Sequence, residues 1–111
     1  THQLFDAAAF RAMPNHAVVI NVGRGPLVDT DALVEALRAG QIAGAGLDVT
    51  DPEPLPDGHP LWEMPNVVIT PHLANPPYSV QRRIGAHAAK VMERFAAGEA
   101  IPTEVDIEAG Y

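Results

Sequence analysis

The stretch Val18-Val19-Ile20-Asn21-Val22-Gly23-Arg24-Gly25-Pro26 decides the fold of this chain. Its beginning is almost continuously apolar and rich in β-branched side chains, which is typical of a strand buried on both faces of a parallel sheet. Glycine and proline then interrupt the apolar run, and Arg24 stands at the interruption between two glycines. The pattern predicts a strand over residues 18–22 that ends in a loop carrying an arginine.

A helix and two further strands are expected after this loop. The helix should begin near Asp29 or Thr30, bury Leu33, Val34 and Leu37, and end before Gly40, a natural C-terminal glycine. Apolar runs at residues 43–49 and 67–70 predict the second and third strands. A β-α-β unit of this kind is right-handed with parallel strands, so the fold class is α/β.

The remaining segments predict shorter elements and one long helix. Asp6 can cap a short helix that Pro14 ends, and residues 51–60 form a stiff loop because they include four prolines. Residues 61–64 fit one helical turn. A long helix is expected over residues 79–97, with Gly98 at its end and an apolar stripe of Val80, Ile84, Val91 and Phe95.

Three parallel strands form only part of a doubly wound sheet. One sheet edge would be unpaired, and parallel sheets need cover on both faces. We therefore expect the chain to be the last part of a larger protein, with the sheet incomplete without upstream residues. Thr1 in the place of a methionine fits either such a fragment or ordinary processing.

Composition narrows the classes of function. With 111 residues, of which 47% are hydrophobic, the chain is one domain at most and is not disordered throughout. A net charge of −7 argues against nucleic-acid binding, and no apolar run approaches the ~20 residues of a membrane span. The absence of cysteine is compatible with a cytoplasmic protein. No histidine spacing typical of a metal site occurs, so no metal is expected.

Charged residues follow all three predicted strands. Arg24 comes after the first strand, Glu53 after the second and His72 after the third. Ligands bind beyond the carboxyl ends of the strands in open α/β sheets, so these residues are candidates for a site that takes a small anion. Each also has a structural alternative: a surface arginine, a solvated carboxylate or a hydrogen-bonded histidine. Asp48, within an apolar run, must point into the crevice or bind backbone donors.

The three strand-end motifs resemble those of one family. Residues 18–29 resemble the arginine motif of the D-isomer-specific 2-hydroxyacid dehydrogenases. Residues 43–49 with 52–55 are similar to their acidic motif, and residues 61–72 to their histidine motif. The resemblance covers essentially the whole chain, but only the C-terminal third or so of such an enzyme.

The resemblance implies a fold, a reaction and a set of site residues. Residues 1–77 would form the C-terminal half of a Rossmann-type dinucleotide-binding domain, residues 78–98 a long crossing helix and residues 99–111 a tail. The full-length protein would be a homodimer that transfers a hydride between NAD or NADP and a small 2-hydroxy or 2-keto acid. Arg24, Glu53 and His72 would be catalytic: the arginine would hold the substrate carboxylate, and the glutamate would pair with the histidine, which acts as acid and base. The resemblance implies that the cofactor is contacted by Val22, Gly23, Arg24, Asp48, His72, Ala74 and Asn75.

Two alternatives to an enzyme stay open at this point. Some proteins of this architecture are cofactor-sensing interaction partners, such as transcriptional corepressors, and keep the same three residues. The chain could also be a non-catalytic binding domain in its own right. The catalytic groups are present but the upstream segments are not, so this chain alone is expected to be inactive.

Overall fold

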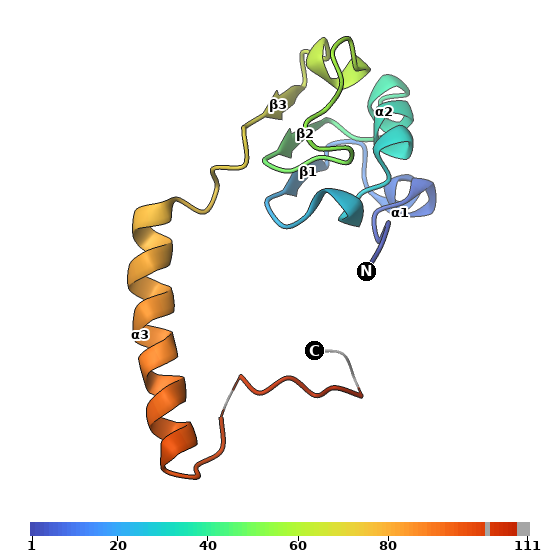
Figure 1. The fold of residues 1–111 in the computed structure, drawn as a ribbon. Helices are drawn as coiled ribbons and strands as arrows, with labels where there is room; N and C mark the ends of the chain where they lie inside the picture. The colour runs from blue at the N-terminus through green and yellow to red at the C-terminus, as the bar shows by residue number, and fades with distance from the viewer. Residues whose placement is uncertain (102, 109–111) are drawn as a thin grey trace. The chain divides into compact units, whose positions relative to one another are not determined.

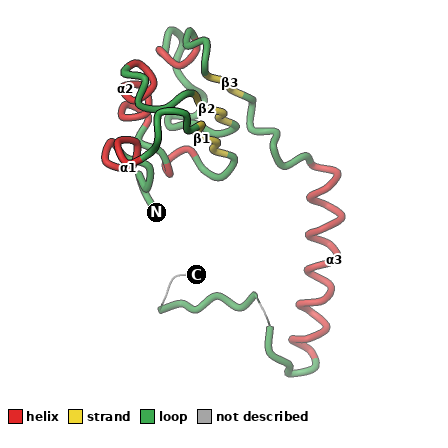
Figure 2. Tube along the Cα trace, turned by 180° about the vertical axis from the view of Figure 1, so that it is seen from behind, coloured by secondary structure: helices red, strands yellow, loops and turns green. Residues whose placement is uncertain are grey.

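The computed structural model describes residues 1–101 and 103–108 and has α/β architecture (Figures 1 and 2). Its elements are, in chain order, α1 (Ala7–Ala12), β1 (Val18–Asn21), α2 (Thr30–Arg38), β2 (Gly44–Leu47), β3 (Val67–Ile69) and α3 (Pro77–Ala96). Two short 3-10 turns, Gly25–Leu27 and Pro60–Trp62, supplement them. The chain divides into two compact units, Thr1–Ala74 and Asn75–Tyr111, which are described separately.

The first unit is built on a three-stranded parallel sheet in the order β1-β2-β3. Its last register row joins Asn21 to Leu47 and Leu47 to Ile69, so the three strands end side by side. This arrangement confirms the predicted parallel β-α-β order. Each strand is shorter than the apolar run that predicted it: β1 ends at Asn21, β2 at Leu47 and β3 at Ile69.

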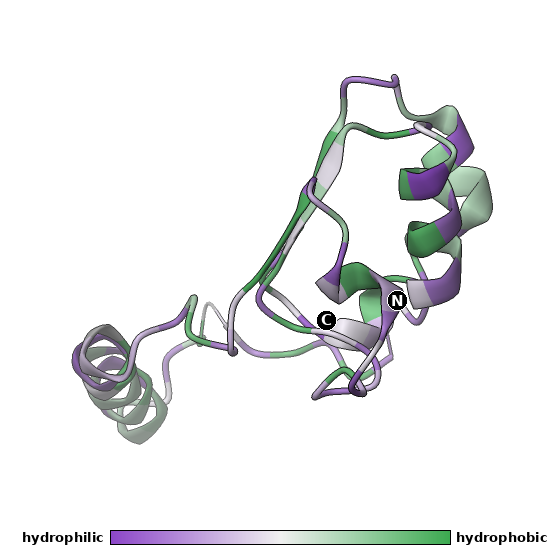
Figure 3. Cartoon of the chain, turned by 90° about the horizontal axis from the view of Figure 1, so that it is seen from above, coloured by the Kyte–Doolittle hydropathy of each residue, from purple (hydrophilic) through white to green (hydrophobic). Residues whose placement is uncertain are grey.

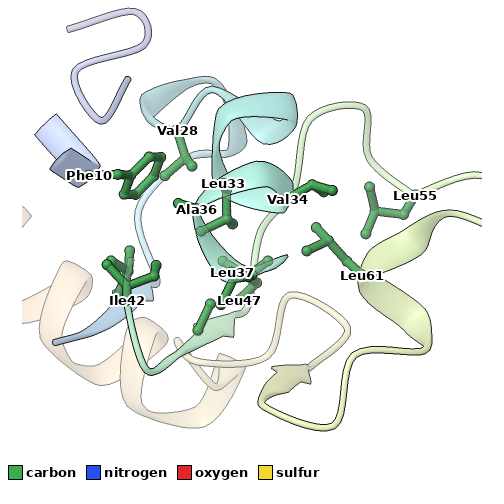
Figure 4. Close-up of a cluster of buried hydrophobic side chains, with 12 residues drawn as sticks. Phe10, Val28, Leu33, Val34, Ala36, Leu37, Ile42, Leu47, Leu55 and Leu61 are labelled. Carbon is green, nitrogen blue, oxygen red and sulfur yellow. The ribbon is translucent and has the colours of Figure 1, made fainter. Parts of the chain in front are cut away.

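The core lies between one face of this sheet and the helices of the first unit (Figures 3 and 4). Leu33, Val34 and Leu37 of α2 are buried, which confirms the predicted buried face of this helix. Phe10 from α1 is fully buried in the same cluster. The other core side chains include Val19, Val28, Ile42, Ala45, Leu47, Leu55 and Leu61.

The opposite face of the sheet is apolar and exposed. Ile20 and Val68 lie on either side of Gly46 in one register row, and their exposed fractions are 71% and 66%. The prediction that the first strand is buried on both faces is therefore wrong for this chain, because no element within residues 1–74 covers that face. The period-2 alternation of buried Val19 and Asn21 with exposed Val18 and Ile20 shows the one-sided burial directly.

Local capping explains where the helices begin and end. The Asp6 carboxylate accepts from Ala8 and Ala9 at the start of α1, and the Asp29 carboxylate accepts from Ala32 at the start of α2. Gly40 follows α2 with a φ of 63°, which confirms its predicted role.

The second unit consists of α3 and the segment after it. The helix begins two residues earlier than predicted, at Pro77, because proline at the first position gives up an N–H that has no helical partner. Gly98 follows it with a φ of 69°, again as expected. Of the predicted tail, residues 102 and 109–111 lie outside the described residues. Within the described part of the chain, no helix is both long and apolar enough to cross a membrane.

Candidate active site

The ends of the three strands bring the candidate residues to one edge of the first unit. Arg24 follows Asn21 of β1 and His72 follows Ile69 of β3 at the same separation, beyond strand ends that lie in one register row. Glu53 comes from the loop after β2, the central strand. Parallel strands deliver the residues after them to the same edge, which is where ligands bind in such sheets.

Glu53 and His72 are in direct contact. The His72 Nδ1 lies 2.7 Å from the Glu53 Oε1, a distance typical of a charge-assisted hydrogen bond. Both side chains are about half exposed, so the pair is open to a ligand. His72 also has a φ of 56°, in the left-handed region that residues other than glycine seldom adopt, although histidine, asparagine and aspartate adopt it more often than most. Such backbone strain is concentrated at functional sites.

Asp48 binds the segment around His72. Its Oδ1 accepts from the Thr70 hydroxyl at 2.5 Å and from the backbone N–H of Leu73 at 2.8 Å, and its Oδ2 accepts from the N–H of Ala74 at 2.8 Å. The Thr70 hydrogen bond is the largest cause that lowers the pKa of Asp48, and the two backbone donors and the nearby His72 act in the same direction against desolvation. Asp48 therefore binds backbone donors, as one of the two expectations from the sequence required, and it also lines the cleft described next, as the other required.

A cleft of about 510 Å³ opens beside the Glu53–His72 pair. Apolar side chains, among them Leu55, Trp62 and Ile69, form much of its wall, and the Trp62 indole is fixed by a 3.1 Å hydrogen bond to the Pro56 carbonyl. Small-molecule sites commonly combine apolar walls with a few polar groups in this way. Arg24 does not line this cleft.

The loop of Arg24 is held against the loop after β2. Gly25 approaches the Thr50 backbone so closely that an added Cβ would lie 1.9 Å from the Thr50 oxygen. Arg24 itself is exposed, and its Nη1 donates to the Gly23 carbonyl at 2.7 Å. The guanidinium therefore lies near its own loop and keeps other donors available for an anion.

The other residues expected at a cofactor fit a nicotinamide. Val22 is an exposed apolar side chain at the end of β1, suited to an aromatic ring, and Gly23 allows close backbone approach. Asp48 Oδ2 accepts only one of the hydrogen bonds described for this carboxylate, so it has capacity for an amide N–H. Ala74 ends the first unit with its N–H bonded to Asp48, whereas Asn75 begins the second unit.

Two polar residues at the site were not singled out by the sequence analysis: Asn21 and Thr70. Both hold backbone or carboxylate groups next to the candidate residues. Asn21 carried a usable signal, a polar side chain in an apolar strand, whereas Thr70 carried none because threonine is ordinary in strands. Among the described residues, no three histidine, aspartate or glutamate side chains gather as a metal site would require.

A parallel α/β sheet with a cleft at the carboxyl ends of its strands defines the class: a nucleotide-binding type of doubly wound domain. The family model described as "D-isomer specific 2-hydroxyacid dehydrogenase, NAD binding domain" matches residues 1–74. The chain belongs to this family, as its motifs predicted.

Similar proteins are longer than this chain. A glyoxylate reductase from Thermofilum pendens is 44% identical over 108 residues, which are 97% of this chain and 32% of that protein. An uncharacterized protein from Corynebacterium melassecola is 57% identical over 111 residues, 100% of this chain and 36% of that protein. A crystal structure of a D-isomer specific 2-hydroxyacid dehydrogenase from Xanthobacter autotrophicus, in complex with NADPH and MES, superposes on this chain with a TM-score of 0.86 at 45% identity. The match covers 100% of this chain and 45% of the Xanthobacter autotrophicus chain. The chain thus spans about a third of the curated relatives it matches.

Proposed function

We propose that the protein containing this chain reduces a small 2-keto acid to a 2-hydroxy acid with NADH or NADPH, and catalyses the reverse oxidation. The observation that carries this proposal is the 2.7 Å contact between Glu53 and His72 beside a cleft at the carboxyl edge of the sheet. The name of the Thermofilum pendens relative makes glyoxylate the first substrate to test.

His72 is the proton donor in the direction of reduction. Its Nδ1 faces Glu53, so the Nε2 is the nitrogen left to meet the substrate. The imidazolium gives the Nε2 proton to the keto oxygen, and the neutral ring that remains keeps its Nδ1 proton toward the Glu53 carboxylate. In oxidation the Nε2 takes the hydroxyl proton back. Glu53 therefore fixes both the ring orientation and the tautomer.

Arg24 binds the substrate carboxylate. A guanidinium can form two parallel, charge-assisted hydrogen bonds with a carboxylate, and Arg24 is exposed beyond the end of β1, where a ligand can reach it. The same cation polarises the adjacent keto group, whose oxygen gains negative charge during reduction.

The nicotinamide ring would be held by Val22, Gly23 and the free acceptor capacity of Asp48, with Arg24, His72, Ala74 and Asn75 completing its surroundings. When bound, the cofactor supplies the hydride for the substrate carbon or accepts it from there. The full-length protein is expected to be cytoplasmic and to form a homodimer. Light scattering of the purified protein tests the dimer.

The test uses this chain in place of the matching segment of the Thermofilum pendens reductase, so that all upstream segments are present. Steady-state rates with glyoxylate and NADPH or NADH are compared for the parent graft and for Arg24→Ala, Glu53→Gln and His72→Asn. Arg82→Ala, which removes an exposed arginine of α3, is the matched control. Cofactor affinity is measured separately by nicotinamide fluorescence.

We expect His72→Asn and Arg24→Ala to lower kcat/KM by at least about 100-fold, the range typical of acid–base and electrostatic groups, with cofactor affinity nearly unchanged. Glu53→Gln should retain more activity, because the amide still accepts from Nδ1. Near-normal turnover of His72→Asn in an active graft would refute the proposal. A graft that binds cofactor but turns over no 2-keto acid would favour the cofactor-sensing alternative.

A further inference from the structure

Asn21 lies at the end of β1 with its side-chain amide turned into the loop of Arg24. Its Oδ1 accepts from the backbone N–H of Gly23 at 3.0 Å, and its Nδ2 donates to the backbone carbonyl of Arg24 at 2.9 Å. The residue is only 6% exposed. The amide thus binds two peptide groups of the loop, the one between Val22 and Gly23 and the one between Arg24 and Gly25.

These hydrogen bonds fix the direction in which Arg24 leaves the strand. The Arg24 carbonyl also accepts from the N–H of Leu27 at 3.2 Å, which starts the short turn over Gly25–Leu27. Asn21 is joined to the central strand in turn, because its backbone carbonyl accepts from Asp48 at 2.9 Å. The amide therefore ties the arginine loop to the row of strand ends that also carries Asp48 and the residues around His72.

We propose that Asn21 is a positioning residue for Arg24, acting on the substrate carboxylate through the arginine and not by contact. Both polar atoms of its side chain are already engaged within the loop, and burial keeps it from a ligand. The inference rests on the proposed role of Arg24 in binding the carboxylate. If Asn21 only stabilised the loop, changing its amide would lower stability without a specific effect on substrate binding. If it positions Arg24, changing the amide weakens the binding of the substrate carboxylate as long as Arg24 is present.

Asn21→Asp tests this role with almost no change of shape. The carboxylate still accepts from Gly23, but its second oxygen faces the Arg24 carbonyl with no proton to donate. Asn66→Asp is the matched control, since the Asn66 Nδ2 donates to the Ala43 carbonyl at 3.0 Å before β2, at the amino end of the sheet. Should Asn21→Asp fail to fold, Asn21→Ser replaces it, because a hydroxyl can accept from Gly23 but is too short to reach the Arg24 carbonyl.

The variants are measured in the same full-length graft, alone and combined with Arg24→Ala. We expect Asn21→Asp to lower kcat/KM for glyoxylate by about 10- to 100-fold, mostly through KM, with cofactor affinity within about twofold. In the Arg24→Ala background the same change should alter kcat/KM less than about twofold, since the residue through which it acts is gone. Asn66→Asp should leave kcat/KM unchanged.

Three results would overturn the inference: an equal loss in both backgrounds, a loss of cofactor affinity as large as the loss in kcat/KM, or no effect of either Asn21 variant. The proposed function fails by a different result, namely full turnover of Arg24→Ala itself. The two failures are therefore distinguishable within one set of proteins.

Discussion

Replacing Gly25 by alanine should push the loop of Arg24 away from the loop after β2, because the two backbones are in close contact at Gly25. The new Cβ would lie 1.9 Å from the Thr50 oxygen and 2.3 Å from the Thr50 carbon, and both atoms belong to backbone. An ordinary contact begins at 3.4 Å, so the two loops must separate by roughly 1.5 Å. No side-chain rotation can relieve this overlap, because the clashing atoms on both sides are fixed to the main chain.

The cost follows from what such a separation breaks. The Val28 N–H donates to the Gly25 carbonyl at 3.1 Å, and the Thr30 hydroxyl donates to the Asp51 carbonyl at 2.6 Å. Losing each of these hydrogen bonds costs about 0.5–1.5 kcal/mol, and inserting a methyl group into packed surroundings costs about 1–3 kcal/mol. We therefore expect Gly25→Ala to lower the free energy of unfolding by about 2–6 kcal/mol.

Urea unfolding of the 111-residue chain, followed by circular dichroism and by the fluorescence of its single tryptophan, measures this loss. Gly46→Ala is the matched control: it adds the same methyl group in β2, where the nearest atom, the Ile20 Cγ1, is at an ordinary 3.7 Å. The control should lie within about 1 kcal/mol of the parent, since alanine also costs less chain entropy than glycine. Equal unfolding midpoints for the two variants, or a Gly25→Ala midpoint equal to that of the parent, would refute the reasoning.

Three further outcomes are expected. Folding lowers the pKa of Asp48, so the contribution of this carboxylate to stability is complete above the ordinary carboxyl range and is lost as pH falls through the lowered pKa. When the pH is lowered from about 7 to about 3, the urea midpoint of Asp48→Asn should therefore fall less steeply than that of the parent. Midpoints that fall in parallel for the two proteins would contradict this. Leu33→Ala, at 1% exposure, should cost about 2–5 kcal/mol in the same urea assay, and a loss below 1 kcal/mol would mean that the core closes over the cavity. His72→Gly should abolish activity of the graft but keep the unfolding free energy within about 1 kcal/mol of the parent. Glycine adopts the left-handed backbone conformation without strain, and this gain offsets the entropy that glycine adds to the unfolded chain. A loss of more than about 2 kcal/mol would show that His72 is mainly structural.

The order of elements could be predicted from the sequence, but the burial of the sheet could not. The apolar run at residues 18–22 indicates a strand wherever such a run occurs, and Asp29 and Gly40 mark the ends of α2 through local capping. Whether Ile20 is covered depends on what packs against the sheet. A continuous apolar run is the pattern of a strand designed for two packed faces, and residues 1–74 supply an element for only one of them.

The candidate site shows the same division between local and long-range information. Strand-end motifs and the family resemblance predict that Arg24, Glu53 and His72 share one site, and the structure adds the 2.7 Å contact between Glu53 and His72. The clash that makes Gly25 obligatory was not foreseen, because it involves Thr50 from a distant part of the chain. The hydrogen bonds from Thr70 and Ala74 to Asp48 likewise join the segments that follow β3 and β2, and such partners cannot be assigned from one segment alone.

Arg24 and His72 are presented by loops of the same construction. Each loop leaves the sheet next to a buried polar residue, Asn21 in one case and Asp48 in the other, and that residue's side chain binds the backbone beyond the strand end. A parallel sheet supplies a row of strand ends but no hydrogen bonds past them, so loops that must hold a charged side chain in one direction need side-chain partners of their own. Buried polar groups are costly when unpaired, and both of these side chains have hydrogen-bond partners in the loops they hold. Substitutions at Asn21 and Asp48 are therefore expected to act on the geometry of the site as well as on stability, whereas substitutions in the core around Leu33 should act on stability alone.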